Sequence, residues 1–223
     1  GFSKLKLNSI YFSYSSSKNY ALENINLEIN KGEFIAINGR SGEGKTTLMD
    51  LMIGFLSPSK GEIIFKNELD KYYNVSLKLN EWRNIIGYVP QEIELVNTTL
   101  AGNIAINAVL DPLKKEKIVK LLEIVNLHNI YSDESQIFNK KIGDYGVNLS
   151  GGQRQRVGIA RSLFNNPEII FLDEATNGLD KKTESKVISN IRNNFPFITL
   201  VTISHRDSLL KLCDKIYNLE NKN

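Results

Sequence analysis

The chain has 223 residues, of which 41% are hydrophobic and 24% charged, which suits one sizeable α/β domain with room for a subdomain. Its 28 basic and 25 acidic residues give a net charge of +3, so the composition does not predict a nucleic-acid-binding surface. No run approaches the roughly 18 consecutive apolar residues that a membrane-spanning helix needs. The single cysteine, Cys213, excludes an internal disulfide.

The first third of the chain reads mainly as strands. Residues 4–14 alternate apolar and polar side chains, with a slip near Asn8, and residues 25–29 alternate again, which predicts half-buried strands. Residues 34–38 form a short, nearly continuous apolar run, typical of a strand buried on both faces. A helix is expected to follow and to end near Gly54. The same reasoning predicts further strands at residues 61–65 and 85–91.

The middle of the chain is different. Ile118, Leu121, Leu122 and Val125 follow the i, i+3, i+4, i+7 spacing of an amphipathic helix. Signals from about residue 98 to 165 are mostly helical, with a loop expected at 132–146. The last third returns to α/β, with strands and helices predicted at 169–174, 181–193, 198–205 and 215–219. We therefore expect an α/β core formed by residues 1–91 and 166–223, interrupted by a helical subdomain of residues 92–165.

A glycine-rich loop lies between the strand at 34–38 and the helix that follows. It fits the pattern G-x-x-x-x-G-K-[ST], whose backbone N–H groups and helix N-terminus cradle phosphates. We expect Lys45 to reach the β- and γ-phosphates of a nucleotide and the Thr46 hydroxyl to bind Mg²⁺. A plain glycine turn with a solvated lysine is the alternative. The predicted nucleotide-binding residues are Gly39, Arg40, Ser41, Gly42, Glu43, Gly44, Lys45, Thr46 and Thr47.

Two acidic residues end the apolar run at 169–172. Because ligands of parallel sheets bind at the carboxyl ends of the strands, Asp173 and Glu174 are expected beside the nucleotide. Successive strand residues face opposite ways, so Asp173 would hold Mg²⁺ and Glu174 would polarise the attacking water. A helix-capping acid is the alternative reading. The guanine-specifying pattern N-K-x-D is absent at residues 139–142, which argues against a GTPase.

A second glycine pair lies about a hundred residues after the phosphate loop. Ser150 and Gln153 have the spacing of a capping box, so a well-capped helix would explain part of the pattern. Gly151 and Gly152 are costly in a first helical turn and make sense where a ligand approaches the backbone. Since the phosphate loop already serves one nucleotide, we expect this helix start to serve a nucleotide held by another copy of the chain.

This segment, Leu149, Ser150, Gly151, Gly152 and Gln153, resembles the signature of the ATP-binding cassette (ABC) ATPase family. With the phosphate loop before it and residues 172–174 after it, the resemblance covers essentially the whole chain. It implies a P-loop NTPase core with a mostly parallel sheet, an N-terminal antiparallel β subdomain and an inserted α-helical subdomain. It also implies a head-to-tail dimer with a second copy of the same or a homologous domain. Two ATP molecules with Mg²⁺ lie between the copies, and the signature acts in trans.

The resemblance carries roles onto four further residues. Tyr14 would stack on adenine, although other aromatic residues lie nearby and it could be an ordinary strand residue. Gln91 would contact Mg²⁺ and the attacking water and sense the transmembrane partner, or it simply ends a strand. Asp180 would lie in the loop that crosses the dimer interface, or cap a helix. His205 would contact the γ-phosphate and position Glu174, or be structural. The catalytic residues are thus Glu174, His205, Lys45 and Gln91, and the metal-binding residues are Thr46, Gln91 and Asp173.

The segments at 95–104, 143–156 and 204–206 resemble the exporter branch of the family. We therefore expect a transport-coupled ATPase domain at the cytoplasmic face of the cell (inner) membrane. Its transmembrane domains would be fused upstream, the domain alone would be soluble, and no nucleic acid would bind. The alternatives are a soluble ABC-type ATPase of DNA repair or translation and a degenerate cassette, and the complete catalytic set opposes the latter. Two departures stand out, an acid at Glu43 where small residues are usual and NGLD at residues 177–180 in place of the commoner SALD.

Overall fold

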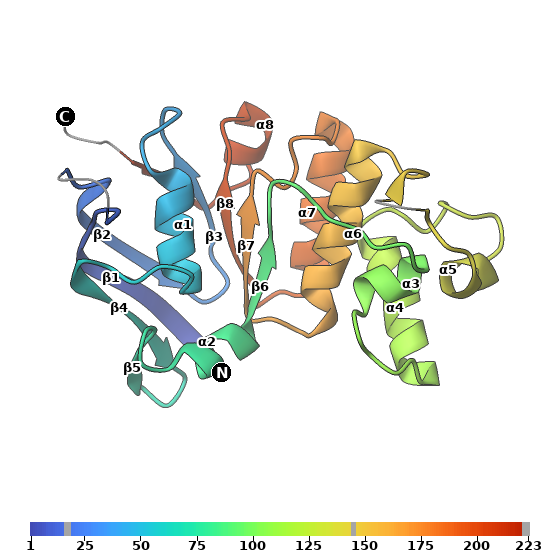
Figure 1. The fold of residues 1–223 in the computed structure, drawn as a ribbon, viewed down its shortest axis with the longest axis horizontal. Coiled ribbons are helices and arrows are strands. Elements are labelled where there is room, and N and C mark those ends of the chain that lie inside the picture. Colours follow the sequence, from blue (N-terminus) through green and yellow to red (C-terminus); the bar gives the residue numbers. More distant parts are fainter. Residues whose placement is uncertain (16–18, 144–145, 220–223) are drawn as a thin grey trace. The chain divides into compact units, whose positions relative to one another are not determined.

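The computed structural model describes residues 1–15, 19–143 and 146–219, which group into two compact units (Figure 1). The first unit comprises Gly1–Tyr88, Glu168–Asp173 and Phe197–Asn223. The second comprises Val89–Pro167 and Glu174–Pro196. The first unit holds both sheets and the second is helical, so the mixed α/β fold predicted from the sequence is confirmed.

An antiparallel sheet in the first unit has the strand order β2–β1–β4–β5. The register of β1 against β2 shifts between Leu7 and Ile10, and Ser9 has a φ of 46°. This β-bulge is the slip predicted near Asn8, because an inserted residue puts the following side chains back in phase with the core. The strands are β1 (Phe2–Phe12), β2 (Leu22–Asn30), β4 (Lys60–Asn67) and β5 (Tyr72–Asn74).

A second sheet in the same unit has the order β6–β7–β8–β3–β9, in which β7, β8, β3 and β9 pair in parallel. Ile203 of β8 pairs with both Ile37 of β3 and Asp173 of β7. The last residues of these strands therefore meet at one edge of the sheet, as the parallel pattern predicts. The strands are β3 (Phe34–Asn38), β6 (Ile86–Val89), β7 (Ile169–Asp173), β8 (Thr199–Ile203) and β9 (Lys215–Asn218).

Helix α1 (Lys45–Ile53) packs into one apolar core with residues of both sheets. It ends where predicted, because Gly54 adopts a φ of 83° and caps the last turn. Helix α2 (Leu79–Ile85) and strand β5 were not predicted from the sequence. Trp82 of α2 is buried and donates its ring N–H to Met52 O at 2.8 Å, so tertiary burial rather than local pattern stabilises this short helix. Helix α8 is Asp207–Leu210.

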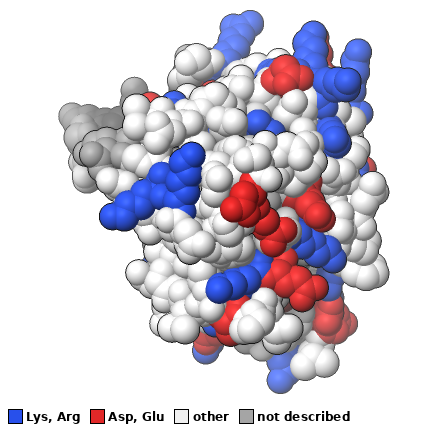
Figure 2. Space-filling model, turned by 90° about the vertical axis from the view of Figure 1, so that its right-hand side faces the viewer, with Lys and Arg blue, Asp and Glu red and all other residues white. Residues whose placement is uncertain are grey.

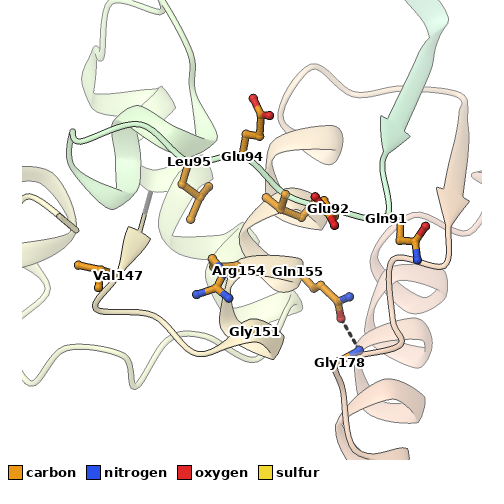
Figure 3. Close-up of a pocket in the computed structure, with 10 residues that line it drawn as sticks. Gln91, Glu92, Glu94, Leu95, Val147, Gly151, Arg154, Gln155 and Gly178 are labelled. Carbon is orange, nitrogen blue, oxygen red and sulfur yellow. Dashed lines mark hydrogen bonds between the residues drawn. The ribbon is translucent and has the colours of Figure 1, made fainter. Parts of the chain in front are cut away.

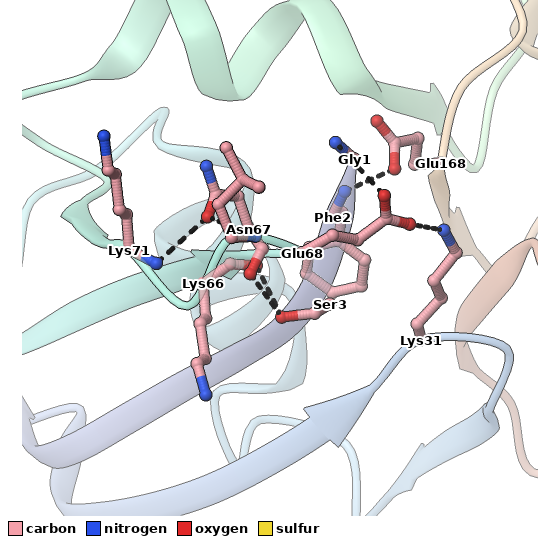
Figure 4. A network of polar contacts seen from close by, with 10 residues as sticks. Gly1, Phe2, Ser3, Lys31, Lys66, Asn67, Glu68, Lys71 and Glu168 are labelled. Carbon is pink, nitrogen blue, oxygen red and sulfur yellow. Dashed lines mark hydrogen bonds and ion pairs between the residues drawn. The ribbon is translucent and has the colours of Figure 1, made fainter.

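Polar contacts hold the start of β1 in the first unit (Figure 4). The Phe2 amide donates to the Glu168 carboxylate, just before β7, and Glu68 forms ion pairs with Lys31 and the Gly1 amino group. The Ser3 hydroxyl donates to the carbonyl oxygens that end β4. These contacts connect segments far apart in the sequence and fix the antiparallel sheet beside β7.

The second unit consists of helices around α6, with α3 and α4 packed against it. Residues 174–196 were expected in the α/β core, whereas their contacts group them here because α7 packs on α4. Asn190 of α7 donates to Ile124 O at 3.0 Å. The helices are α3 (Leu100–Ile104), α4 (Pro112–Ile124), α5 (Ser135–Asn139), α6 (Gly151–Phe164) and α7 (Lys181–Asn194).

Helix α5 lies inside the segment expected to be a loop, 132–146. Two contacts account for this short helix. The Ile137 side chain is buried, and the Asp133 carboxylate accepts the Ser135 backbone N–H at 2.9 Å. Acidic and basic side chains are interspersed on the face of the second unit that carries α4 and α5 (Figure 2). Among the described residues, none of the helices combines the length and apolar character required to cross a bilayer.

Candidate functional site

The phosphate loop runs from the end of β3 to the start of α1. Gly42 and Gly44 have φ values of 84° and 90°, a left-handed conformation that side chains resist, and this lets the loop curl before the helix. Lys45 folds back along the loop, and its Nζ donates to Gly39 O and Arg40 O, both at 2.8 Å. The lysine thus lies over the loop, where a bound phosphate would compete with the backbone carbonyls for its charge.

Glu43 also folds over the phosphate loop. Its carboxylate accepts the backbone N–H of Arg40 at 2.5 Å, and a Cβ added to Gly39 would lie 2.7 Å from the same oxygen. An amide that the loop could offer to an anion therefore already has an internal anionic partner. This departure from the family pattern would therefore affect phosphate binding by the loop.

His205 and Asp173 lie at the carboxyl edge of the parallel sheet with the loop. A hollow of about 610 Å³ is lined by His205, Arg40 and Glu43, together with Asn38, Gly39, Asn218 and Leu219. Asp173 is buried at the end of β7, whereas Thr46 is exposed in the first turn of α1. A carboxylate and a hydroxyl are hard oxygen donors of the kind that Mg²⁺ takes, so the chemistry of this pair fits the ion.

The pKa of Tyr88, in β6, is affected by acidic groups of the first unit. Burial raises the pKa of the Tyr88 phenol to about 12, and the negative charges of Asp173 and Asp50 act in the same direction. Burial also raises the pKa of Asp50. The phenol therefore stays protonated beside a carboxylate that is expected to hold a metal.

Tyr14 lies close to the first turn of α1. Its hydroxyl is 2.8 Å from Thr47 Oγ1, and its ring meets Phe12 edge to face with 4.9 Å between centroids. The side chain remains 46% exposed, so much of the ring is open to solvent. Tyr11 and Tyr20, the competing aromatic residues, pack against each other instead. The geometry thus separates Tyr14 from its neighbours and associates it with the phosphate loop.

Glu174 belongs to the second unit, and the structure brings it to Gln91. Glu174 has a φ of 49°, unusual for a residue with a side chain and typical of strained functional positions. One carboxylate oxygen, Oε2, accepts a 2.7 Å hydrogen bond from Asn177 Nδ2 and a longer one, 3.4 Å, from Gln91 Nε2. The two predicted catalytic residues are therefore neighbours, and Asn177 donates to the same oxygen of Glu174 as Gln91 does.

The signature segment forms the start of α6, with the predicted capping box. The Ser150 hydroxyl accepts the Gln153 amide at 3.2 Å, and the Ser150 amide donates to Gln153 Oε1 at 2.7 Å. The two glycines differ in their surroundings. A Cβ on Gly152 would lie 2.8 Å from Gly178 O, whereas at Gly151 the nearest described atom outside the helix backbone would be Arg154 Nη2 at 3.9 Å. Close packing explains Gly152, while Gly151 opens outward.

Asp180 caps α7, accepting the Thr183 amide at 3.0 Å, and hydrogen bonds with Thr183 lower the pKa of its carboxyl group. The capping role that sequence reasoning kept as an alternative is thus confirmed. Two residues before it, Gly178 donates its amide to Gln155 of α6 at 2.8 Å (Figure 3). This hydrogen bond ties the turn before α7 to the signature helix.

A hollow of about 660 Å³ in the second unit lies beside these residues. Figure 3 shows side chains from the loop after β6, the start of α6 and the turn before α7 arranged around it. The Arg161 guanidinium of α6 donates to Glu94 O at 3.1 Å and so holds this loop. It also donates to Asn103 O of α3 at 2.8 Å. Sequence reasoning missed Arg161, Asn103, Gln155 and Asn177. Only Asn177 carried a signal, its departure from the family pattern.

The comparisons with known proteins identify the family. The family model described as ABC transporter matches residues 22–177, more than half of the chain. This chain belongs to the ABC transporter family. The ATP-binding domains of this family hydrolyse ATP for transport.

Three relatives of this ABC transporter domain are informative. It is 37% identical over 214 residues to the leukotoxin translocation ATP-binding protein LktB of Pasteurella haemolytica-like sp. (strain 5943B), covering 95% of this chain and 29% of LktB. It is 36% identical over 218 residues to the alpha-hemolysin translocation ATP-binding protein HlyB of Escherichia coli O157:H7, covering 97% and 30%. A solved structure of a bacterial Atm1-family ABC exporter with ATP bound superposes with a TM-score of 0.86 at 29% identity, covering 99% of this chain and 37% of that one. The ABC transporter domain thus spans about a third of the length of these relatives, and none of the three supports the soluble, transport-independent alternative.

Proposed function

We propose that this chain is the motor domain of a membrane exporter and that it hydrolyses ATP as a head-to-tail pair around two Mg-ATP. The observation that carries the proposal is a contact of Glu174, the residue directly after Asp173. Its carboxylate accepts a hydrogen bond from Gln91 Nε2 at 3.4 Å. A carboxylate beside a carboxamide can orient and deprotonate water. The first unit, which contains the phosphate loop, would bind ATP, and the second unit, which contains α6, would carry the signature.

Nucleotide binding would use residues of the first unit together with Gln91 of the second. Tyr14 would stack on adenine, and Lys45 would leave the carbonyl oxygens of its loop to pair with the β- and γ-phosphates, assisted by the loop amides. Mg²⁺ would be held by Thr46, Asp173 and Gln91 and would neutralise charge on the phosphates.

The chemical step would use Glu174 as general base. The water oxygen forms a bond to the γ-phosphorus as the bond to the bridging oxygen of ADP breaks, and the water proton passes to Glu174. His205 would contact the γ-phosphate and position Glu174. The products are ADP and inorganic phosphate.

The partner in this scheme is a second copy of the same or a homologous domain. Its Ser150 hydroxyl and the amides at the start of its α6 would meet the γ-phosphate, because a helix N-terminus with an open Gly151 suits a close anionic ligand. Asp180 would lie at the interface between copies. ATP would then favour the closed pair by binding it better than the open one.

Transport would require transmembrane domains, which we propose are fused upstream in the full-length protein. LktB and HlyB are named for translocation of a leukotoxin and of alpha-hemolysin, and this chain matches about a third of each. The domain would therefore act at the cytoplasmic face of the cell (inner) membrane, without a nucleic-acid partner. The exported substrate would be chosen by those membrane domains.

The deciding experiment is the substitution Glu174→Gln. This variant should bind ATP with near wild-type affinity, hydrolyse it at least about a hundredfold more slowly, and accumulate as an ATP-dependent dimer in light scattering. Glu116→Gln, on the exposed face of α4, is the matched control and should hydrolyse normally. Normal turnover by Glu174→Gln would refute the assignment.

The trans arrangement has its own test. Lys45→Ala and Ser150→Arg chains should each be inactive alone, and mixing them should restore hydrolysis, since each heterodimer contains one composite site free of both substitutions. Absence of recovery at every mixing ratio contradicts the shared site.

A further inference from the structure

The turn after Glu174 departs from the family pattern at residues 177–180, and the first of these residues contacts the proposed general base. Asn177 Nδ2 donates to Glu174 Oε2 at 2.7 Å. A hydrogen bond of this length to an ionised carboxylate belongs to the stronger class of protein hydrogen bonds. The substituted position thus touches the group whose orientation matters most for hydrolysis.

The backbone directs Asn177 to this contact. The Asn177 amide donates to Glu174 O at 3.1 Å, closing a turn that carries its side chain back over Glu174. The next residue, Gly178, donates to Gln155 Oε1 at 2.8 Å, and a Cβ at this glycine would lie 2.8 Å from the same oxygen. The turn is therefore anchored to α6 on one side while its asparagine reaches the carboxylate on the other.

Both amide donors around Glu174 use the same oxygen. Gln91 Nε2 lies 3.4 Å from Oε2, so Asn177 supplies the shorter of the two hydrogen bonds. Two donors on Oε2 fix the plane of the carboxylate and leave Oε1 as the oxygen that can take a proton.

We propose that Asn177 is a positioning residue for ATP hydrolysis. By donating its carboxamide N–H to Oε2, it holds the Glu174 carboxylate beside Gln91 and presents Oε1 to the attacking water. The proton moves from water to Oε1 in the step described above, and Asn177 neither gains nor loses a proton. This inference rests on the proposed role of Glu174 as general base.

The test compares Asn177→Ala and Asn177→Ser with the wild-type chain. Loss of a hydrogen bond to a charged group should lower kcat in Asn177→Ala by about tenfold or more, while the KM for ATP and the affinity for a non-hydrolysable ATP analogue change less than about twofold. Asn177→Ser keeps an O–H donor and should retain more activity than Asn177→Ala. Asn193→Ala, at an exposed position of α7, is the matched control and should match wild type.

A double-mutant cycle separates positioning from a structural role. In a Glu174→Gln background, Asn177→Ala should cause no further loss of the residual single-turnover rate, because the group it positions has gone. The same fold loss in both backgrounds overturns the proposal. So does an Asn177→Ala chain that hydrolyses at or above the wild-type rate while Glu174→Gln is inactive, an outcome that leaves the proposed function standing. Normal hydrolysis by Glu174→Gln would instead remove the proposed function itself.

Discussion

The side-chain nitrogen of Lys45 lies 2.8 Å from the carbonyl oxygen of Gly39, at the other end of the same phosphate loop. Lys45 is nearly buried, and its charge is satisfied by backbone oxygens. In the proposed function, nucleotide binding would exchange these contacts for contacts with phosphate oxygens.

Lys45→Ala should consequently weaken ATP binding by about tenfold or more, since it removes a charge-assisted contact to phosphate. A fluorescent ATP analogue titrated into the variant measures the change. Lys186→Ala, at an exposed position of α7, controls for a general loss of positive charge. Equal ATP affinity in Lys45→Ala and the wild-type chain would contradict the phosphate-binding role.

Glu43→Ser should strengthen ATP binding several-fold. The substitution frees the Arg40 amide from the Glu43 carboxylate and removes a negative charge from the loop. Titration at low and high salt provides the check, because a charge effect should shrink as salt screens it. Weaker binding by Glu43→Ser would mean that the carboxylate supports the loop rather than competing with phosphate.

The two signature glycines should respond differently to alanine. Gly152→Ala places a Cβ 2.8 Å from the Gly178 carbonyl oxygen, a backbone atom that cannot move cheaply, and should lower the free energy of unfolding by about 1–3 kcal/mol. Gly151→Ala meets open space and should leave stability unchanged or slightly higher, because alanine has the better helix propensity, yet it should slow hydrolysis if a partner's phosphate approaches there. Urea unfolding and ATPase assays on both variants separate the effects. A stable Gly152→Ala chain, or a fully active Gly151→Ala chain, would contradict the respective argument.

The raised pKa of Tyr88 predicts that the chain loses stability at alkaline pH. Its folded pKa of about 12 lies above the ordinary value of 10.0, so above pH 10 the unfolded chain loses the phenolic proton first. Its contribution to the free energy of unfolding is fully present below pH 10 and is lost as the pH rises to about 12. Urea unfolding of Tyr88→Phe should therefore show a smaller decrease between pH 9 and pH 11 than that of the wild-type chain. Identical decreases would refute the assignment.

Much of the fold was predictable because local pattern and tertiary environment agree. The uninterrupted apolar run of β3 reflects burial on both faces, and the slip in β1 matches a bulge at Ser9. Short elements escaped prediction where one buried residue decides the outcome. Trp82 stabilises α2 and Ile137 anchors α5, and neither short helix has a periodic pattern long enough to detect.

The candidate site divides in the same way. The phosphate loop and the capping box of Ser150 and Gln153 are local motifs, so their residue types could be read directly. The contacts of Asn177 with Glu174 and of Arg161 with Asn103 depend on how distant or turning backbone segments meet. Residue types alone do not encode those meetings, although the unusual asparagine drew attention to its position.

The hydrogen bond between Gln155 and Gly178 has a consequence for timing in a paired assembly. It joins the signature helix to the turn that carries Asn177. In the proposed pair, these connected segments would contact the partner's nucleotide at the signature and orient this chain's own Glu174 through Asn177. Departure of phosphate from one site would then be felt at the second site as a shift of its base. The two sites of such a pair would hydrolyse ATP alternately rather than independently. Gln155→Ala removes this hydrogen bond and should bring the two sites closer to independent turnover.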